Sequence, residues 1–279
     1  MDYLIFTKVI IIKRGKMKLK IYQIDAFTNA IFKGNPAAVI IIDEWLSEDK
    51  MQSIAIENNL SETAFAKKCD DITYEIRWFS PITEIDFCGH ATLATAFVLF
   101  QENSSINEVI FIAKAVGSLK VKQLDDGYIE MIFPNRKPSK VELIPEELKN
   151  GLSIEPKDVY VNQQTYFVIY PNEEDVYNVQ IEIEEIKKLG PLDVTVTSKS
   201  TEYDFISRYF WPANGGIEDP VTGSMHTGLA PLWAEILDKN ELLSYQASNR
   251  GGILKCKVSD EQVVIQGQAI QYLEGYINI

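Results

Sequence analysis

Short segments in which apolar and polar residues nearly alternate recur along this chain, and that pattern predicts strands with one buried face. Residues 19–25 show it first, and the unbroken apolar run at 37–42 predicts a buried strand. Further strands are predicted at 63–67, 72–79, 109–113, 118–123, 128–133, 159–161, 166–170, 194–197, 205–210, 252–258, 262–266 and 269–279.

Two segments, 89–100 and 224–237, carry apolar residues on nearly every side of a helix. Because a helix of that kind is buried, each is predicted to lie at the centre of a surrounding sheet. A more polar helix, capped by Ser47, is predicted to run to about Glu57. Two further short helices are predicted at 146–150 and 183–189.

The segments that lead into the two buried helices resemble each other. Residues 86–94 and 219–230 each run from an acidic residue, through a turn of small residues, into an apolar helical pattern. A repeat of this length predicts two similar halves. The alignment pairs Gly89 with Gly223, His90 with Ser224, and Cys88 with Thr222.

If the two halves face each other, two helix starts point into one cleft. The first N–H groups of a helix lack partners within the helix, and its dipole is positive at that end. Such a cleft would bind a carboxylate, which suits an enzyme that acts on a small acid.

The order of elements predicts an α+β fold in which each half is a curled, mostly antiparallel sheet around one helix. Regular βαβ alternation is missing, and no glycine-rich phosphate loop or dinucleotide fingerprint follows a strand. We therefore expect no cofactor. The first half is predicted to span 17–125, with the terminal strand 268–279 returning to it, and the second half 126–267.

Residues 1–16 do not fit this plan. Their apolar run at 3–12 is too short to cross a bilayer, and basic residues follow it instead of preceding it as in a secretory signal. We expect an extension that is disordered or not native. A sharper hypothesis is that Met17 is the native start, because codons for residues 13–16 can resemble a bacterial ribosome-binding site.

The composition of the chain limits the classes of molecule that it can bind. The chain of 279 residues has 40 acidic and 27 basic residues and a formal net charge of −13, so it should repel nucleic acids and anionic membranes. An anionic substrate therefore needs a local positive site. Three widely spaced cysteines indicate no disulfide framework and favour a reducing cytoplasm. With only two histidines and no CxxC pair, no metal site is expected.

Five motifs occur in order along the chain: 34–39 (GNPAAV), 59–65 (NLSETAF), 86–94 (DFCGHATLA), 218–224 (EDPVTGS) and 250–252 (RGG). Over residues 18–279 they resemble those of the phenazine-biosynthesis PhzF-like family. That resemblance implies the diaminopimelate-epimerase-like fold, an active site between the halves, and a homodimer.

Glu62 lies between a predicted helix and a strand in an apolar stretch. A carboxyl group partly removed from water has a raised pKa and can both accept and donate a proton near neutral pH. The alternative is a glutamate at a strand edge that bonds to neighbouring backbone. The resemblance implies that Glu62 is the acid–base catalyst.

His90 follows Gly89 at a helix start, where a positive helix end disfavours the imidazolium, so a neutral ring is expected. It could equally be a packed histidine, and Asp219 could simply cap its loop. The resemblance implies instead that His90 and Asp219 orient the substrate. It also implies that Ser224 and the N–H groups of Gly89 and Gly223 hold the substrate carboxylate.

Cys88 and Thr222 lie where racemases of this fold carry two cysteines that act from opposite faces of the substrate. Because a threonine hydroxyl is far too weak an acid or base for the second step, two-base racemisation is not expected. The Cys/Thr pair resembles hydroxyproline dehydratases of the same fold, although Cys88 could equally be a buried structural residue. Weaker candidates lie elsewhere in the chain. Arg208 and Arg250 could bind an anion, Tyr209 and Trp211 could form an aromatic wall, and Asn214 is a further candidate.

These features favour an isomerase that relocates a proton on a small, cyclic or unsaturated carboxylic acid, with Glu62 as its only base. One alternative is proton abstraction or dehydration by Cys88 on an amino or imino acid. Another is a non-catalytic protein that binds a small acid.

Overall fold

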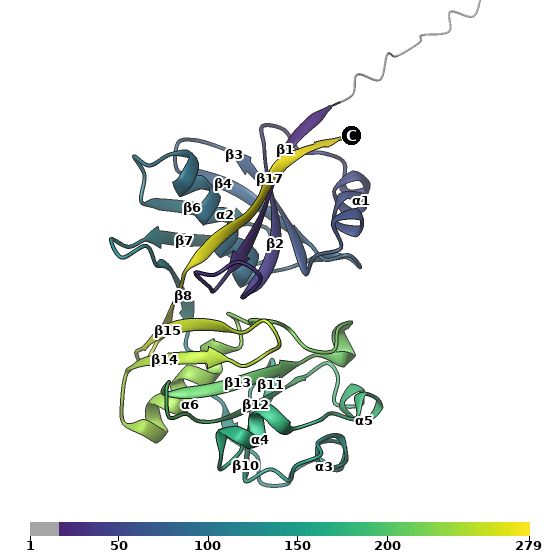
Figure 1. Ribbon diagram of the computed structural model, residues 1–279, viewed down its shortest axis with the longest axis vertical. Helices are drawn as coiled ribbons and strands as arrows, with labels where there is room; N and C mark the ends of the chain where they lie inside the picture. The colour runs from purple at the N-terminus through teal and green to yellow at the C-terminus, as the bar shows by residue number, and fades with distance from the viewer. Residues whose placement is uncertain (1–16) are drawn as a thin grey trace, which may run out of the picture.

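The computed structural model describes residues 17–279, so the predictions made for residues 1–16 lie outside the described residues. Two lobes are stacked along the long axis of the molecule (Figure 1). The first lobe comprises residues 17–134 and 269–279, and the second lobe comprises 135–267. Within residues 17–279, no helix is both long and apolar enough to cross a membrane.

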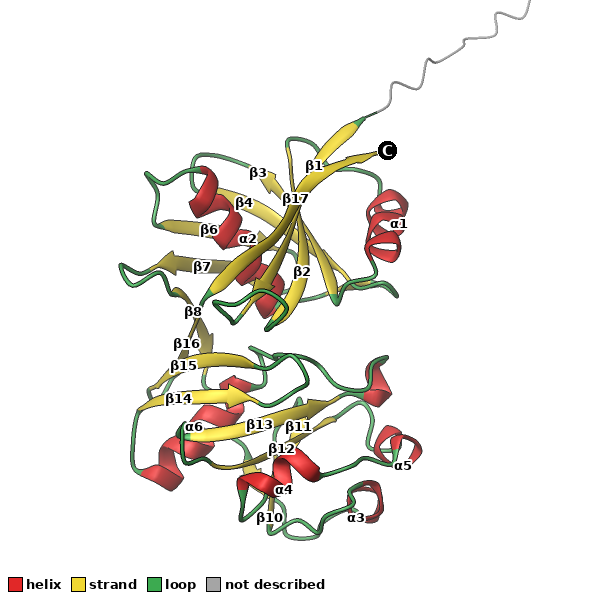
Figure 2. Cartoon of the chain, viewed as in Figure 1, coloured by secondary structure: helices red, strands yellow, loops and turns green. Residues whose placement is uncertain are grey.

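The first lobe is a curled sheet around one buried helix, with a second helix on its outside (Figure 2). Its elements are β1 (Lys18–Ala26), β2 (Asn35–Ile42), α1 (Glu48–Asn58), β3 (Glu62–Lys68), β4 (Thr73–Phe79), β5 (Glu84–Ile85), α2 (Gly89–Glu102), β6 (Glu108–Ala113), β7 (Gly117–Gln123), β8 (Ile129–Pro134) and β17 (Ala269–Asn278).

The second lobe repeats this plan with shorter outer helices. Its elements are β9 (Ser139–Lys140), α3 (Glu146–Gly151), β10 (Asp158–Val161), β11 (Thr165–Ile169), α4 (Glu173–Asn178), α5 (Ile183–Lys187), β12 (Asp193–Lys199), β13 (Phe205–Phe210), η1 (Pro212–Asn214), α6 (His226–Leu237), β14 (Glu241–Gln246), β15 (Gly252–Val258) and β16 (Gln262–Gly267).

The two lobes have the same strand topology. The first lobe has the order β1-β2-β3-β4-β6-β7-β8 and the second β10-β11-β12-β13-β14-β15-β16. In both, the second and third strands are parallel, as are the fourth and fifth, and all other neighbours are antiparallel. The internal repeat predicted from two short motifs therefore extends through the whole fold.

Two sets of contacts join the lobes. β8 pairs with β7 on one side and with β16 on the other, and β17 returns to pair with β1 (purple and yellow in Figure 1). Phe27, which follows β1, is fully buried with a φ of 63°. A Cβ on Gly267 would lie 2.3 Å from Cδ1 of Phe27, so only glycine fits beside this ring.

Both central helices are almost entirely buried, as their all-round apolar sequences predict. Apolar residues of α2 and α6 belong to a single hydrophobic core that continues from one lobe to the other. Two hydroxyls on α2 are satisfied locally: those of Thr92 and Thr95 donate to the carbonyls of Cys88 and Ala91, one turn earlier.

Several local features differ from the predictions. The elements that were not predicted are β14, the short helix α4, and the very short β5, β9 and η1; the first turn of α4 is the acidic run 173–175. The helix expected from Ser224 starts at His226. Residues 223–225 instead form a turn in which His226 N–H donates to Gly223 and Thr227 N–H to Ser224, both three residues back. These tighter bonds delay the α-helix by two residues.

Candidate active site

A cavity of about 150 Å3 lies between the two lobes, and all eight residues predicted for the site line it. Ser61, Ile85, Phe87, Gln164, Asp193, Tyr209 and Trp211 complete the wall. The predicted residues are Glu62, Cys88, Gly89 and His90 from the first lobe, and Asp219, Thr222, Gly223 and Ser224 from the second.

The two helix starts face each other across this cavity. Gly89 is the first residue of α2, and Gly223 opens the turn before α6. A Cβ on Gly89 would lie 3.8 Å from Cα of Gly223, so the two backbones come close. Unpaired N–H groups and positive dipole ends thus meet at one place, which favours an anion.

Glu62 is the first residue of β3, and its carboxylate is buried. Its Oε2 atom lies 3.0 Å from Nε2 of His90. The angles of this contact do not make a hydrogen bond, and Oε2 has no other hydrogen-bond partner within the described part of the chain. The structure thus differs from the alternative of a glutamate bonded to backbone, because Oε2 keeps its lone pairs available.

His90 is buried between Glu62 and Cys88, whose Sγ lies 3.4 Å from Nδ1 of the ring. Burial opposes the imidazolium, but Cys88 and Glu62 outweigh it and raise the pKa of His90 well above its usual value. This direction is opposite to the one expected from the helix dipole alone.

Cys88 is poorly suited to act as a base. Burial, with the negative charge of Glu62, raises the pKa of its thiol to about 11. The sulfur also forms a cluster with the ligand atoms of Glu62 and His90, all within 4.8 Å of one another. A metal would need the thiol and the imidazolium to lose protons that these surroundings hold on them, so the cluster suits proton transfer better.

Asp219 lies in the loop before α6 and does not cap that helix, whose N-cap is Met225. One carboxylate oxygen accepts a hydrogen bond from Nδ2 of Asn35 at 2.8 Å, and the other accepts one from the Thr222 hydroxyl. Burial raises the pKa of Asp219 to about 6, although His90 and these donors oppose the shift. Asn35 therefore holds Asp219 from the opposite lobe.

The sequence analysis did not single out Asp193 or Gln164. Asp193 accepts hydrogen bonds from the Tyr209 hydroxyl and, at 2.8 Å, from Asn214. Gln164 donates to Tyr209 at 3.1 Å and to Ser224 at 2.9 Å. The fold shows a correspondence that the sequence did not: Asp193 begins the third strand of the second lobe, just as Glu62 begins that of the first.

Arg208 does not line the cavity. Its guanidinium makes two hydrogen bonds to Glu218, at 2.8 and 2.9 Å, and contacts the carbonyls of Val176 and Val179. This bidentate ion pair is the structural alternative to anion binding. Asn214 also lies outside the cavity wall, where it supports Asp193.

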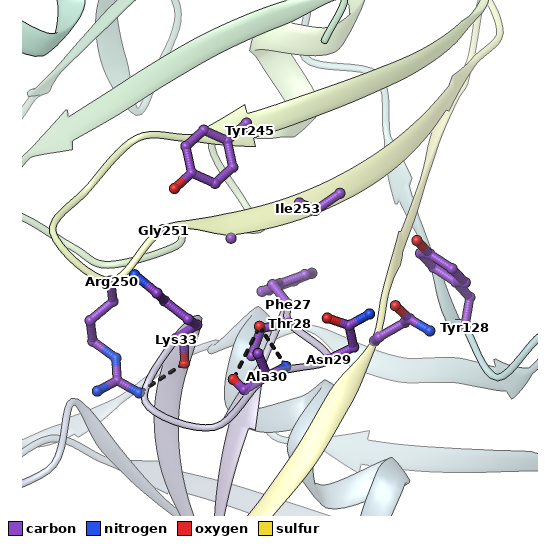
Figure 3. A pocket seen from close by; sticks show the side chains of 12 residues that line it. Phe27, Thr28, Asn29, Ala30, Lys33, Tyr128, Tyr245, Arg250, Gly251 and Ile253 are labelled. Atoms are coloured by element: carbon purple, nitrogen blue, oxygen red, sulfur yellow. Dashed lines mark hydrogen bonds between the residues drawn. The ribbon is translucent and has the colours of Figure 1, made fainter. Parts of the chain in front are cut away.

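Arg250 lines a different cavity, of about 290 Å3, on the seam between the lobes (Figure 3). Its guanidinium donates to a carboxylate oxygen of Asp25 and to the carbonyls of Lys33 and Gly34, each at 2.8 Å. Arg250 thus ties the loop between β14 and β15 to the first lobe. Its charge is paired there, away from the predicted substrate carboxylate.

Comparison with known proteins places this site in a family. A profile of the phenazine biosynthesis-like protein family matches residues 24–275. An uncharacterized isomerase of Halalkalibacterium halodurans is 44% identical over 262 residues, which cover 93% of this chain and 98% of that protein. A crystal structure of a PhzF-family phenazine biosynthesis protein from Enterococcus faecalis is 40% identical, with a TM-score of 0.89, and covers 94% of this chain and all of that one.

A known structure with much lower sequence identity has the same fold. A hydroxyproline epimerase from Agrobacterium vitis shares only 10% sequence identity, with a TM-score of 0.56 over 94% of this chain and 93% of that one. The predicted α+β fold with two similar epimerase-like halves is therefore confirmed.

Proposed function

Since the chain belongs to the phenazine biosynthesis-like (PhzF) family, we propose that it is an isomerase that moves a proton between two carbons of a small carboxylic acid, without a cofactor. The bacterial relative described above carries the name isomerase. The observation that carries the proposal is the buried Oε2 atom of Glu62, which lines the cavity and has no hydrogen-bond partner there.

The substrate carboxylate binds at the facing helix starts. Ser224 and the backbone N–H groups of Gly89 and Gly223 surround this point, and the dipoles of α2 and α6 add positive potential. The cavity is small, about 150 Å3. These features favour a compact acid with a single ring or a short unsaturated chain.

Glu62 then takes a proton from one carbon of the bound acid. The electron pair left on that carbon spreads into the substrate's double bonds towards its carboxylate, where His90 and the helix starts stabilise the negative charge. Glu62, now protonated, returns a proton to another carbon on the same face, and exchange of its carboxyl hydrogen with water in part of the turnovers brings deuterium from D2O into the product. The substrate gains and loses no atom, and the Glu62 carboxylate is restored.

His90 and Asp219 orient the substrate during both steps. His90 contacts Glu62 directly, and its raised pKa keeps a positive charge beside the developing negative one. Asp219 is fixed by Asn35 and Thr222, so it can accept a hydrogen bond from a substrate hydroxyl or amino group in a defined direction. Assembly as a homodimer in the cytoplasm remains part of the proposal.

A survey of deuterium incorporation from D2O tests this mechanism, with mass spectrometry applied to a panel of cyclic, unsaturated and amino carboxylic acids. Wild type should incorporate deuterium into at least one acid, and Glu62→Gln should abolish this. Cys88→Ala should retain it. Glu57→Gln, an exposed glutamate on α1, is the matched control and should behave as wild type.

Two results would contradict the proposal. Loss of exchange in Cys88→Ala alone would favour proton abstraction or dehydration by the cysteine. Tight binding of an acid without exchange in any variant would favour a protein that only binds small acids.

A further inference from the structure

We propose that Asp193 is a positioning residue that forces the Ser224 hydroxyl to donate its hydrogen into the cavity, and thereby makes the site select carboxylates. The inference rests on the proposed function in one respect, that an acid binds beside Ser224. Its evidence is a chain of four side chains, Asp193–Tyr209–Gln164–Ser224, in which each hydrogen bond fixes the direction of the next.

The chain begins at an acceptor. Asp193 is buried at the start of β12, and Asn214 donates to its Oδ1 atom. The Oδ2 atom faces the Tyr209 hydroxyl. An ionised carboxylate has no hydrogen to give, so Tyr209 must donate to it. Having used its only hydrogen, the Tyr209 oxygen can only accept from its other neighbour.

That neighbour is the side-chain amide of Gln164. Its Nε2 atom lies 3.1 Å from the Tyr209 oxygen and 2.9 Å from Oγ of Ser224. Because Tyr209 can only accept, Gln164 must present nitrogen and not oxygen at this point. Both hydrogens of that nitrogen are then used, one on Tyr209 and the other on Ser224.

Ser224 is the last member of the chain. Its oxygen accepts from Gln164, so its own hydrogen is left free on the cavity side. A donor in this position attracts a carboxylate and repels a group that offers only hydrogens. The hydrogen-bond direction that Asp193 sets on one wall therefore makes the site beside Ser224 prefer a carboxylate.

The backbone holds this arrangement before any ligand binds. The N–H of Asp193 donates to the carbonyl of Gln164 at 3.0 Å, and the N–H of Gln164 donates to Oδ1 of Asn162 at 2.9 Å. The two ends of the Asp193–Gln164 pair are therefore fixed by both main chain and side chain. Such a supported site can orient a hydroxyl precisely enough to affect binding.

Asp193→Asn should reverse the whole chain with almost no change of shape. Asn214 still donates to one side of the new amide, which must therefore turn its oxygen towards Asn214 and its NH2 group towards Tyr209. Tyr209 then donates to Gln164, whose amide flips. Ser224 must now donate to the flipped oxygen, and no hydrogen remains for the ligand.

Neutron diffraction of D2O-exchanged crystals reads this direction without any ligand. In the wild type, the deuterium on Ser224 should point into the cavity, and in Asp193→Asn it should point at Gln164. A wild-type Ser224 deuterium directed at Gln164 would overturn the inference.

The effect on ligand binding is measured by calorimetry with benzoate and its uncharged analogue benzamide. Asp193→Asn should weaken benzoate binding about ten- to a hundredfold, the range for one hydrogen bond to a charged group, and should weaken benzamide binding much less. Asp260→Asn, an exposed aspartate, is the matched control. Equal losses for both ligands would indicate a merely structural role and overturn the inference.

A double-mutant cycle adds a second check. In a Ser224→Ala background the end of the chain is missing, so Asp193→Asn should have no further effect on the benzoate to benzamide ratio. Additive effects would contradict the chain. If benzoate fails to bind the wild type, that result counts against the proposed function, and the diffraction experiment still decides the inference.

Discussion

The segment that starts α2 in the first lobe and the one that leads into α6 in the second face each other in one cavity, yet their side chains differ in kind. The first carries Cys88 and His90, which titrate, whereas Thr222 and Ser224 hold the equivalent positions in the second. At these paired positions the titrating side chains thus belong to the first lobe and the hydroxyl groups to the second. On the proposed mechanism, such an arrangement provides one base on one face of the substrate.

The first residues of the third strands, Glu62 in β3 and Asp193 in β12, differ in a similar way. Oε2 of Glu62 has no hydrogen-bond partner in the described structure, whereas Asp193 is held by both Tyr209 and Asn214. A carboxylate without partners can accept a proton from a substrate, while one with fixed partners can only orient its neighbours. On the proposed mechanism, these duplicated positions have separate tasks.

The largest effect should come from exchanging these two carboxylates for amides. Glu62→Gln should lower turnover about 10²- to 10⁴-fold, the usual contribution of an acid–base group, with little change in stability. Asp193→Asn should mainly raise KM. Steady-state kinetics on the acid found by deuterium exchange, with circular dichroism as a folding check, would measure this. Equal losses of kcat in both variants would remove the proposed difference between the lobes.

The two histidines provide the next comparison, because their surroundings raise the pKa of His90 and lower the pKa of His226. Full burial lowers the pKa of His226 to about 4, while its Nδ1 atom contacts the Thr222 carbonyl at 2.8 Å. Above pH 6.5 the ring is neutral in both folded and unfolded chains. Between pH 6.5 and 4 the unfolded chain binds the proton first, so stability falls as pH falls, by about 3 kcal/mol in all.

His226→Asn isolates this effect, since its side-chain amide can still donate to Thr222 but does not titrate. Urea unfolding at pH 7 and pH 4.5 should show a smaller acid-induced loss of stability in the variant than in the wild type. The same loss in both would mean that His226 is not responsible.

A smaller effect is expected from the facing glycines. A Cβ on Gly223 would lie 3.1 Å from Cζ of the buried Phe27 ring, whereas a Cβ on Gly89 meets nothing closer than 3.8 Å. Gly223→Ala should therefore lower the free energy of unfolding by about 1–3 kcal/mol, as overpacking does. Gly89→Ala should leave stability nearly unchanged. Thermal unfolding of both variants tests this, and equal melting temperatures would contradict it.

The features that could be predicted from the sequence are those that local pattern determines. The central helices follow from apolar residues on every side, and the meeting of Gly89 with Gly223 follows from the repeat. Asp193 was missed because nothing beside it in the sequence marks it. Its partner Tyr209 lies on the neighbouring strand β13, and Asn214 lies in η1, so only the folded chain brings them together.

The pKa of His90 also could not be predicted from the neighbouring sequence. The helix dipole next to it in the sequence predicts a neutral ring, but a carboxylate from β3 lies 3.0 Å away in the fold. A full charge at that distance outweighs the partial charge of a helix end. The early start predicted for α6 failed for a related reason, because apolar periodicity does not distinguish a tight first turn from an α-helical one.

The smallest effect concerns Thr222, which holds the place of Cys88 in the second lobe and donates to Asp219. Thr222→Val keeps the shape and removes a bond that favours the ionised carboxylate, so the pKa of Asp219 should rise above its value of about 6. Activity should then fall by roughly a factor of a few at pH 6 and not at all at pH 8, as the pH dependence of kcat/KM would show. Cys88→Ala, the matched change in the first lobe, should leave this acid limb in place, because Sγ contacts His90 and not Asp219. An unchanged acid limb in Thr222→Val would mean that Asp219 does not control it, and that the hydroxyl in the second lobe, which also accepts from Gln246, is only structural.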